Sequence, residues 1–267
     1  MKVSARESVA THALLVIAAL FAVYPLGSII ASAVQRAAGE GIGLSNFSTA
    51  WTRGHFGSAL VSSAVVALTV VVITALVSCL AGYALATMRV PGGRLIMGIL
   101  LIGLVLPYEV TVLPLYQMLA GWGLIDTYWA LILPQIGLSV PLGVFWMRTF
   151  FRSVPGELLE AARIDGASRF EVLRLVLLPI AGPAIATLAT ILFLFTWNEF
   201  LLALILVPQN EAVQTAPLAL SFFSGTDRAS NPNITAAAAV LVALPIIITY
   251  VILQRRLITG LTAGAVK

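Results

Sequence analysis

Six long apolar runs constrain what this chain can fold into more than any other feature of its sequence. A transmembrane helix needs about 20 predominantly apolar residues. Runs of that length occupy residues 10–33, 59–86, 95–119, 128–150, 180–207 and 235–253. They are too long for strands and show no alternation of apolar and polar residues. The sequence therefore predicts an all-α membrane protein with six transmembrane helices.

The charge balance agrees with a membrane protein and not with a nucleic-acid-binding protein. Of the 267 residues, 60% are hydrophobic and 10% charged, whereas a soluble domain has about a quarter of its residues charged. The net charge of +4 does not indicate a nucleic-acid partner, because the basic residues lie between apolar runs and not on one face. The lipid bilayer is the expected surrounding.

The basic residues also predict the orientation of the chain. Short cytoplasmic loops retain Lys and Arg. If the N-terminus is cytoplasmic, 12 of the 15 basic residues fall inside, and Arg36, Arg53 and Arg228 fall outside. This predicts both termini in the cytoplasm. The alternative for the first run is a cleaved signal peptide ending near Ala33, but a cleaved apolar segment is usually shorter than this one.

No cofactor or metal site is expected on this chain. Cys79 is the single cysteine, and His12 and His55 are far apart in the sequence, so no metal-binding pair is indicated. A P-loop needs a lysine that follows glycine. Lys2 and Lys267 are the two lysines and neither follows glycine, so ATP hydrolysis on this chain is not expected.

A polar segment, residues 153–179, separates the fourth and fifth runs and predicts a helix, a tight turn and a second helix. Pro155 suits a helix start, and Gly166 permits a break with a left-handed backbone. Ser168 and Glu171 have the spacing of a capping box. The second helix is expected to place Phe170, Leu173 and Leu177 on one apolar face and to end at Pro179. The alternative is an amphipathic connector at the membrane surface.

The same segment carries a motif that resembles a known family. Glu160-Ala161-Ala162 is followed by Gly166 and closes with Val176-Leu177-Leu178-Pro179, which is similar to the EAA loop of permease subunits of ABC importers, although isoleucine is commoner than valine at the first position of the close. The resemblance implies that this loop docks on a cytoplasmic ATPase. The residues it implies for that coupling are Glu160, Ala161, Ala162, Asp165, Gly166 and Pro179.

Further stretches resemble the carbohydrate importers of the maltose-permease type. They are residues 106–117, 123–127, 161–167, 197–200, 254–256 and 260–267. The resemblance implies one permease domain over residues 1–267 in a bacterial inner membrane, and half of a translocation pathway for a sugar or sugar-like solute. It also implies a second permease subunit, two ABC ATPase subunits that hold ATP and Mg²⁺, and an extracytoplasmic solute-binding protein. The identity of the solute stays open.

Ionisable residues inside the apolar runs are candidates for the solute pathway, because a charge within a membrane must face protein or water. These are Glu109 in the third run and Glu199 in the fifth, where Trp197 and Asn198 precede it. The tryptophan could stack on a sugar ring, and the amide and carboxylate could bind hydroxyl groups. The alternative is that these side chains bind or pack against a neighbouring helix or the partner subunit. The polar stretch 208–233 is the candidate contact for a solute-binding protein.

The alternatives to an importer are an intramembrane protease and a passive channel or scaffold. An intramembrane serine protease needs a base beside its nucleophile, and both histidines lie at or beyond the predicted membrane edge. In a passive channel or scaffold, the loop at residues 153–179 would have no cytoplasmic ATPase to bind. A passive channel or scaffold remains the alternative to the importer.

Overall fold

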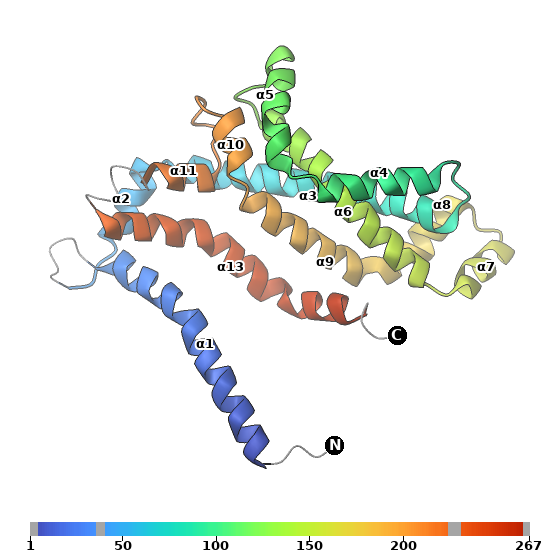
Figure 1. Cartoon of the computed structure of the whole chain (residues 1–267), viewed down its shortest axis with the longest axis horizontal. Helices are drawn as coiled ribbons and strands as arrows, with labels where there is room; N and C mark the ends of the chain where they lie inside the picture. Colours follow the sequence, from blue (N-terminus) through green and yellow to red (C-terminus); the bar gives the residue numbers. More distant parts are fainter. Residues whose placement is uncertain (1–4, 36–40, 224–230, 264–267) are drawn as a thin grey trace. The chain divides into compact units, whose positions relative to one another are not determined.

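The computed structural model of the chain describes residues 5–35, 41–223 and 231–263 and is built from helices (Figure 1). Among these residues there is no β-strand, and an isolated antiparallel bridge joins Gln35 and Ile42. The helices are α1 (Ala5–Val34), α2 (Ser45–Arg53), α3 (Phe56–Thr87), α4 (Gly93–Val105), the 3-10 helix η1 (Tyr108–Thr111), α5 (Val112–Gly121), α6 (Tyr128–Ser153), α7 (Gly156–Ile164), α8 (Arg169–Glu171), the π-helix η2 (Val172–Leu177), α9 (Leu178–Trp197), α10 (Leu201–Leu206), α11 (Ala216–Phe223) and α13 (Pro232–Ala263).

Most of the predicted membrane spans are present as long apolar helices. Within the described residues five helices have the length and composition to cross a bilayer: Thr11–Val34, Phe56–Thr87, Tyr128–Ser153, Arg169–Trp197 and Pro232–Ile252. The pair Gly93–Val105 and Tyr108–Gly121 makes a sixth crossing if its two parts form one span, and they are bent by 95°. The all-α, multi-pass prediction is confirmed, and the third predicted run is bent, not straight.

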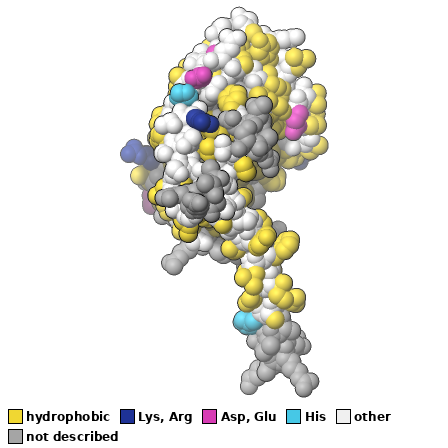
Figure 2. All heavy atoms as spheres, turned by 90° about the vertical axis from the view of Figure 1, so that its left-hand side faces the viewer, with side chains coloured by type: hydrophobic (Ala, Val, Ile, Leu, Met, Phe, Trp, Pro, Cys, Tyr) yellow, Lys and Arg dark blue, Asp and Glu magenta, His cyan; other side chains and the backbone are white. Residues whose placement is uncertain are grey.

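Large hydrophobic side chains lie on the surface of the protein as well as in its core. Figure 2 shows one face on which hydrophobic side chains are widespread and charged ones are few. Leu68, Ile102 and Val105 are among the exposed examples. A surface of this kind suits contact with lipid, since acyl chains are as apolar as leucine.

The chain divides into two compact units, one of residues 1–57 and 219–244 and the other of residues 58–218 and 245–267. In the first unit, the Asn46 side chain donates hydrogen bonds to the carbonyls of Ala33 (2.9 Å) and Gln35 (2.8 Å). These bonds satisfy carbonyl groups that the end of α1 leaves without a helical partner. The single permease domain expected over residues 1–267 stays a prediction.

The second unit is organised around α6, which packs against α4, α9 and α10. Two groups of buried side chains form its core. The first core cluster includes Leu131 of α6 and Leu202 and Leu206 of α10. The second core cluster joins α3, α6, η2 and α9 through Tyr83, Met147, Phe151, Val172, Leu173, Leu177, Leu188 and Leu192. The second cluster lies beneath the segment that links α6 to α9.

Helices α3 and α6 approach each other closely at small residues. A Cβ atom on Gly82 of α3 would lie 2.8 Å from the backbone nitrogen of Arg148 in α6, and one on Gly143 of α6 would collide with the hydroxyl of Ser78 in α3. Ser78 and Gly82 are four residues apart, which places both on one face of α3. Small residues at this spacing are typical of tightly packed membrane helices.

Candidate functional site

The segment between α6 and α9 forms the predicted helix, turn and helix. Helix α7 begins directly after Pro155 and ends at Ile164. Gly166 has a φ of +83°, as expected for a glycine that follows a helix. The N–H of Ala167 donates to the carbonyl of Ala162 (3.0 Å), and the N–H of Gly166 donates to that of Arg163 (3.1 Å). This pair of bonds is the Schellman motif, which satisfies the last carbonyls of α7.

The predicted capping box closes the other side of the turn. The N–H of Glu171 donates to the hydroxyl of Ser168 (3.3 Å), and the N–H of Ser168 donates to the Glu171 carboxylate (2.8 Å). The two N–H groups that would otherwise lack partners at the start of α8 are thus bonded. The turn at Gly166 is therefore closed on both sides by hydrogen bonds within residues 162–171.

The prediction that the second helix ends at Pro179 is wrong. The chain continues from α8 through η2 into α9, as one helix of 29 residues from Arg169 to Trp197. Proline lacks an N–H and its ring clashes with the carbonyl four residues earlier in an α-helix. The wider π-turn of Val172–Leu177 lies directly before Pro179 and changes the hydrogen-bond spacing there. Pro179 is thus an exposed residue of the first turn of α9.

The expected apolar face of this helix is also only partly correct. Leu173 and Leu177 are buried in the second core cluster, but Phe170 is 63% exposed. The three residues would share a face in a regular α-helix, and the π-turn shifts that register. Phe170 therefore lies on the surface of the turn and not in the core.

The turn is held to the membrane helices by a buried tyrosine. The hydroxyl of Tyr83 in α3 donates to the carbonyl of Arg169 at the start of α8 (2.8 Å). The ring of Tyr83 packs edge-on against Phe151 of α6, with ring centroids 6.1 Å apart. A displacement of the turn would thus disturb the packing of both α3 and α6.

Most of the residues expected to couple to an ATPase lie on the surface of this segment. Glu160, Ala161, Asp165 and Gly166 are exposed, and Ala162 is half-buried against the second core cluster. Ile164, which the sequence analysis did not single out, is 86% exposed at the end of α7. A large aliphatic residue within a polar, helical loop is the signal that could have identified it.

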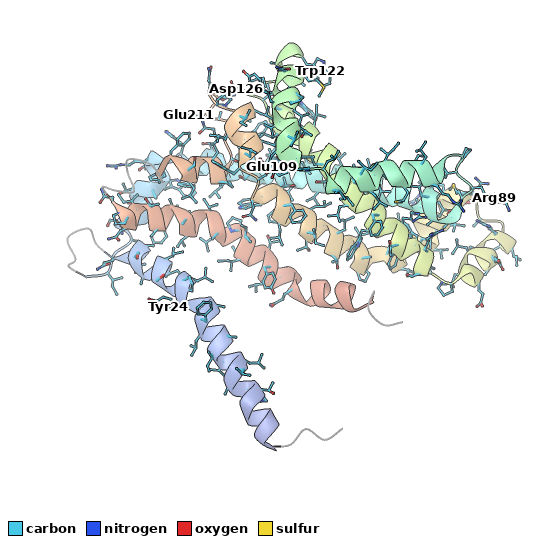
Figure 3. The ribbon with its side chains drawn as sticks, in the orientation of Figure 1. Tyr24, Arg89, Glu109, Trp122, Asp126 and Glu211 are labelled. Carbon is cyan, nitrogen blue, oxygen red and sulfur yellow. The ribbon has the colours of Figure 1, made fainter. Side chains whose placement is uncertain are left out.

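The second group of predicted residues lies at two interruptions in apolar helices. Helix α4 ends at Val105, and Leu106 and Pro107 are extended before η1 begins. The residue before a proline is disfavoured in a helical conformation, which accounts for the bend. Glu109 follows the bend and is exposed at the foot of α5 (Figure 3).

The fifth predicted run is interrupted as well. Helix α9 ends at Trp197 and α10 begins at Leu201. The Glu199 carboxylate accepts hydrogen bonds from the N–H groups of Leu202 (2.8 Å) and Ala203 (3.3 Å). The Asn198 side chain donates to the carbonyl of Leu194 (2.8 Å). The Glu199 carboxylate thus satisfies N–H groups that lack helical partners at the start of α10. The Asn198 side chain adds a second hydrogen bond to a carbonyl that already accepts from the Asn198 N–H.

The environment of Trp197 differs from that of an open stacking platform. Trp197 is 3% exposed, and its ring lies against Phe193 with centroids 5.4 Å apart. Asn198 is exposed, whereas Glu199 is half-buried. Tyr108 at the first interruption packs against the first core cluster, which includes Leu202 and Leu206 of α10 directly after the second interruption, so the two interruptions are close together in the fold.

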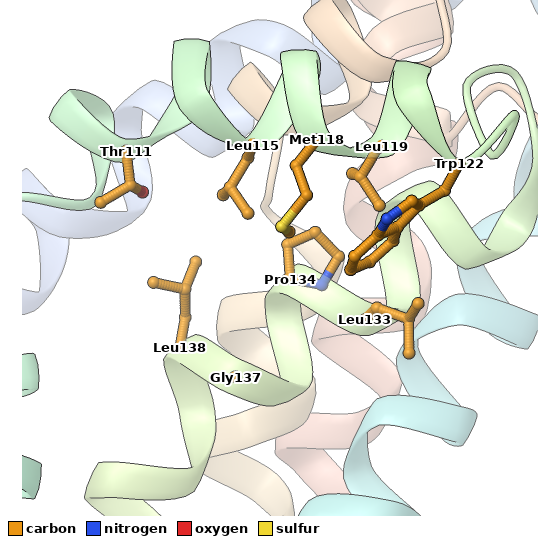
Figure 4. Close-up of a pocket in the computed structure, with 9 residues that line it drawn as sticks. All are labelled: Thr111, Leu115, Met118, Leu119, Trp122, Leu133, Pro134, Gly137 and Leu138. Atoms are coloured by element: carbon orange, nitrogen blue, oxygen red, sulfur yellow. The ribbon is translucent and has the colours of Figure 1, made fainter.

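A cavity of about 330 Å³ lies between α5 and α6 (Figure 4). It is lined by Thr111, Leu115, Met118, Leu119, Trp122, Leu133, Pro134, Gly137 and Leu138. The Thr111 hydroxyl already donates to the carbonyl of Tyr108 (2.6 Å). A binding site for a polar ligand needs several polar groups that point into it, and this lining is nearly all apolar. Elsewhere in the described residues, no group of three or more His, Cys, Asp or Glu residues is placed to hold a metal ion.

Comparison with known proteins identifies the family. Residues 78–262 match the family "binding-protein-dependent transport system inner membrane component". The trehalose transport system permease protein SugB of Mycobacterium tuberculosis is 39% identical over 213 residues, which are 79% of this chain and 77% of the relative. The melibiose/raffinose/stachyose import permease protein MelC of Bacillus subtilis is 32% identical over 227 residues, 85% of this chain and 82% of the relative.

The fold is that of a solved transporter. A chain in the crystal structure of a bacterial ABC transporter that imports the acidic polysaccharide alginate matches with a TM-score of 0.78 and 22% identity, covering 96% of this chain and 99% of that chain. The interrupted helices and the long loop between α6 and α9 are thus parts of a permease fold. The chain belongs to the binding-protein-dependent transport system inner membrane components and is a multi-pass permease subunit of a bacterial inner membrane.

Proposed function

We propose that this chain forms half of the translocation pathway of a sugar importer and couples it to separate cytoplasmic ATPase subunits through α7 and α8. The observation that carries the proposal is the exposed turn between these helices. Its backbone is closed by the Schellman motif and the capping box, while large apolar side chains on it face outward. A rigid element with exposed apolar groups is what a docking helix requires.

The surface of this element suits a protein partner. Ile164 and Phe170 are apolar anchors, and the exposed Glu160 and Asp165 offer negative charge beside them. Apolar centres with a polar rim are typical of protein interfaces. We propose that two ABC ATPase subunits, which hold ATP and Mg²⁺, dock here and on the equivalent element of a second permease subunit. Both termini of this chain then lie in the cytoplasm.

The solute class follows from the relatives. The two permeases described above are named for trehalose and for melibiose, raffinose and stachyose, and at this level of identity we propose a sugar for this chain too. Glu109 and Asn198, which are exposed at the two interruptions, are the proposed solute-facing groups. Glu199 stabilises the second interruption through its hydrogen bonds to the N–H groups of α10. Trp197 stabilises it by packing against Phe193. An extracytoplasmic solute-binding protein delivers the sugar.

The test is a comparison of two isoleucine variants. Ile164 is 86% exposed on the proposed docking element, and Ile42 is 80% exposed in the first unit, outside it. N-terminally tagged wild type, Ile164→Glu and Ile42→Glu are purified from native membranes in mild detergent, and the recovered chains are identified by mass spectrometry. ATP-dependent uptake of labelled trehalose and melibiose is measured in the same cells.

We expect the wild type and Ile42→Glu to retain a second permease and an ATPase. Ile164→Glu retains the second permease but loses about 90% or more of the ATPase, because a buried charge at an interface anchor costs about 2 kcal/mol or more. Sugar uptake falls with it. Full ATPase recovery with Ile164→Glu would contradict the docking element. A well-folded wild type without any ATPase would favour the passive channel or scaffold instead.

A further inference from the structure

One aspartate ties together two loops that are about 80 residues apart in the sequence. Asp126, in the connection from α5 to α6, donates its N–H to the carbonyl of Leu206 (2.9 Å). Its Oδ1 atom accepts from the N–H groups of Gln209 (2.9 Å) and Asn210 (3.0 Å), and its carbonyl accepts from the Asn210 side chain (3.0 Å). Four hydrogen bonds thus join this residue to the last residue of α10 and to the segment that follows it.

The remainder of that segment is fixed by other helices. The hydroxyl of Ser62 in α3 donates to the carbonyl of Ala212 (2.9 Å) and lies 3.1 Å from the Tyr128 hydroxyl of α6. Further along, the N–H of Ala216 donates to the Ser63 hydroxyl (2.8 Å). The loop at residues 207–215 is therefore held at its start, its middle and its end.

Only part of this loop is open to a partner. Residues 208–212 are exposed, whereas residues 213–216 are buried. The exposed part presents Gln209 and Glu211 on a backbone that Asp126 fixes; Asp126 and Glu211 are labelled near α10 in Figure 3. A loop that is ordered before binding does not have to be ordered by its partner, and this raises affinity.

The position of the loop identifies the side of the membrane that it faces. Helix α6 begins two residues after Asp126 and ends at Ser153, three residues before α7. Its 26 residues span about 39 Å at 1.5 Å per residue, which exceeds the hydrocarbon thickness of about 30 Å. If α7 docks an ATPase in the cytoplasm, as in the proposed function on which this step rests, the loop lies on the opposite side.

We propose that residues 208–212 are a preformed docking surface for the extracytoplasmic solute-binding protein, and that Asp126 is the positioning residue that holds it in shape. The family depends on a binding protein, and this polar, immobilised loop faces the compartment in which such a protein works. Asp126 itself does not touch the partner. It acts through the backbone of Gln209 and Asn210.

The chemistry of the clamp defines the variants. Asp126 has a φ of +61°, a conformation that glycine and asparagine tolerate. Asp126→Gly keeps the turn and removes the acceptor. Asp126→Asn keeps both the turn and an Oδ1 atom for the two N–H groups, so it should behave as the wild type. Asp126→Gly thus lacks the clamp, whereas the wild type and Asp126→Asn both have it, and all three residues tolerate this backbone conformation.

The assay uses the assembled transporter, with its partner permease and ATPases, in lipid nanodiscs. ATPase activity is measured while sugar-loaded binding protein is titrated. We expect the binding-protein concentration for half-maximal stimulation to rise about tenfold in Asp126→Gly, the order expected when the backbone of one loop residue must be ordered on docking. The basal rate, the maximal rate and the Asp126→Asn titration stay as in the wild type.

An unchanged half-maximal concentration in Asp126→Gly would overturn the proposal, as would a lowered maximal rate at an unchanged half-maximal concentration. If Asp126→Gly does not assemble, Gln209→Trp decides the question, because it blocks the exposed surface and leaves the backbone bonds to Asp126 in place. It must raise the half-maximal concentration, and an unchanged value would refute the docking surface. A wild type that binding protein does not stimulate at all would instead refute the proposed function.

Discussion

Gly166 shows how a single backbone conformation shapes the cytoplasmic surface proposed for this permease. Its φ of +83° is unfavourable for a residue with a side chain, yet a Cβ atom there would meet nothing within 4 Å. The constraint is therefore conformational and not steric. The variants Gly166→Asn and Gly166→Val separate the two, since asparagine tolerates the left-handed region far better than valine.

We expect Gly166→Val to lower ATPase affinity about tenfold, because a left-handed residue other than glycine costs about 1–2 kcal/mol. Gly166→Asn should retain most of the affinity. Binding of purified ATPase to the permease complex, followed by fluorescence anisotropy, measures both. Equal losses for the two variants would mean that the side chain itself obstructs docking.

Residues whose environment is local were predictable from the sequence. Ser168 and Glu171 form the expected capping box because both partners lie within one helical turn. The contacts of Trp197 with Phe193 and of Glu199 with Leu202 are also local. The break between α9 and α10 that lets Glu199 cap α10, however, is marked by no glycine or proline. The run through these residues is therefore predicted as continuous, because the residues of α10 are as apolar as those of α9.

At the level of helices, α3 and α6 approach each other closely at small residues. Gly143→Ala would force its methyl group against Ser78, whereas Gly137 in the same helix has open space around it. We expect Gly143→Ala to destabilise the protein by about 1–3 kcal/mol, the usual cost of overpacking. Gly137→Ala should be neutral or slightly stabilising, because alanine favours helix over glycine.

The single buried thiol, Cys79, gives the readout. It lies in α3 next to Ser78, and it becomes reactive to a thiol-specific dye when α3 and α6 separate. A lower midpoint of thermal unfolding for Gly143→Ala than for Gly137→Ala is the expected order. The reverse order would show that α6 moves away from α3 at little cost.

Helix bends and ends were less predictable than helix existence. Pro107 lies at the bend before η1, as expected for a proline within an apolar run. Pro179 carries the same signal, but the chain stays helical there because the π-turn precedes it. A proline can end a helix, bend it or leave it nearly unchanged, and the outcome depends on how the neighbouring residues pack. Here those neighbours are Leu173 and Leu177, and a single sequence does not reveal their packing.

For the whole molecule, the orientation in the membrane is the prediction that matters most. In a Cys79→Ala background, we expect a cysteine at Gln209 to react with a membrane-impermeant maleimide in cells whose inner membrane is intact. A cysteine at Glu157, in the first turn of α7, should react only after that membrane is permeabilised. Labelling of both from the same side would contradict the topology and the positive-inside assignment.

The close approach of α3 and α6 limits how this permease can move. Gly82 and Gly143 bring the two backbones together at successive places, so neither helix has room to slide along the other. The interruptions at Leu106–Pro107 and at Asn198–Phe200 differ, because the regular helical hydrogen bonds already end there. At the second one, the Glu199 carboxylate accepts from free N–H groups of α10. We therefore expect the α3–α6 pair to move as one body, and the conformational changes of transport to occur at the two interruptions, where no regular helical turn has to be broken.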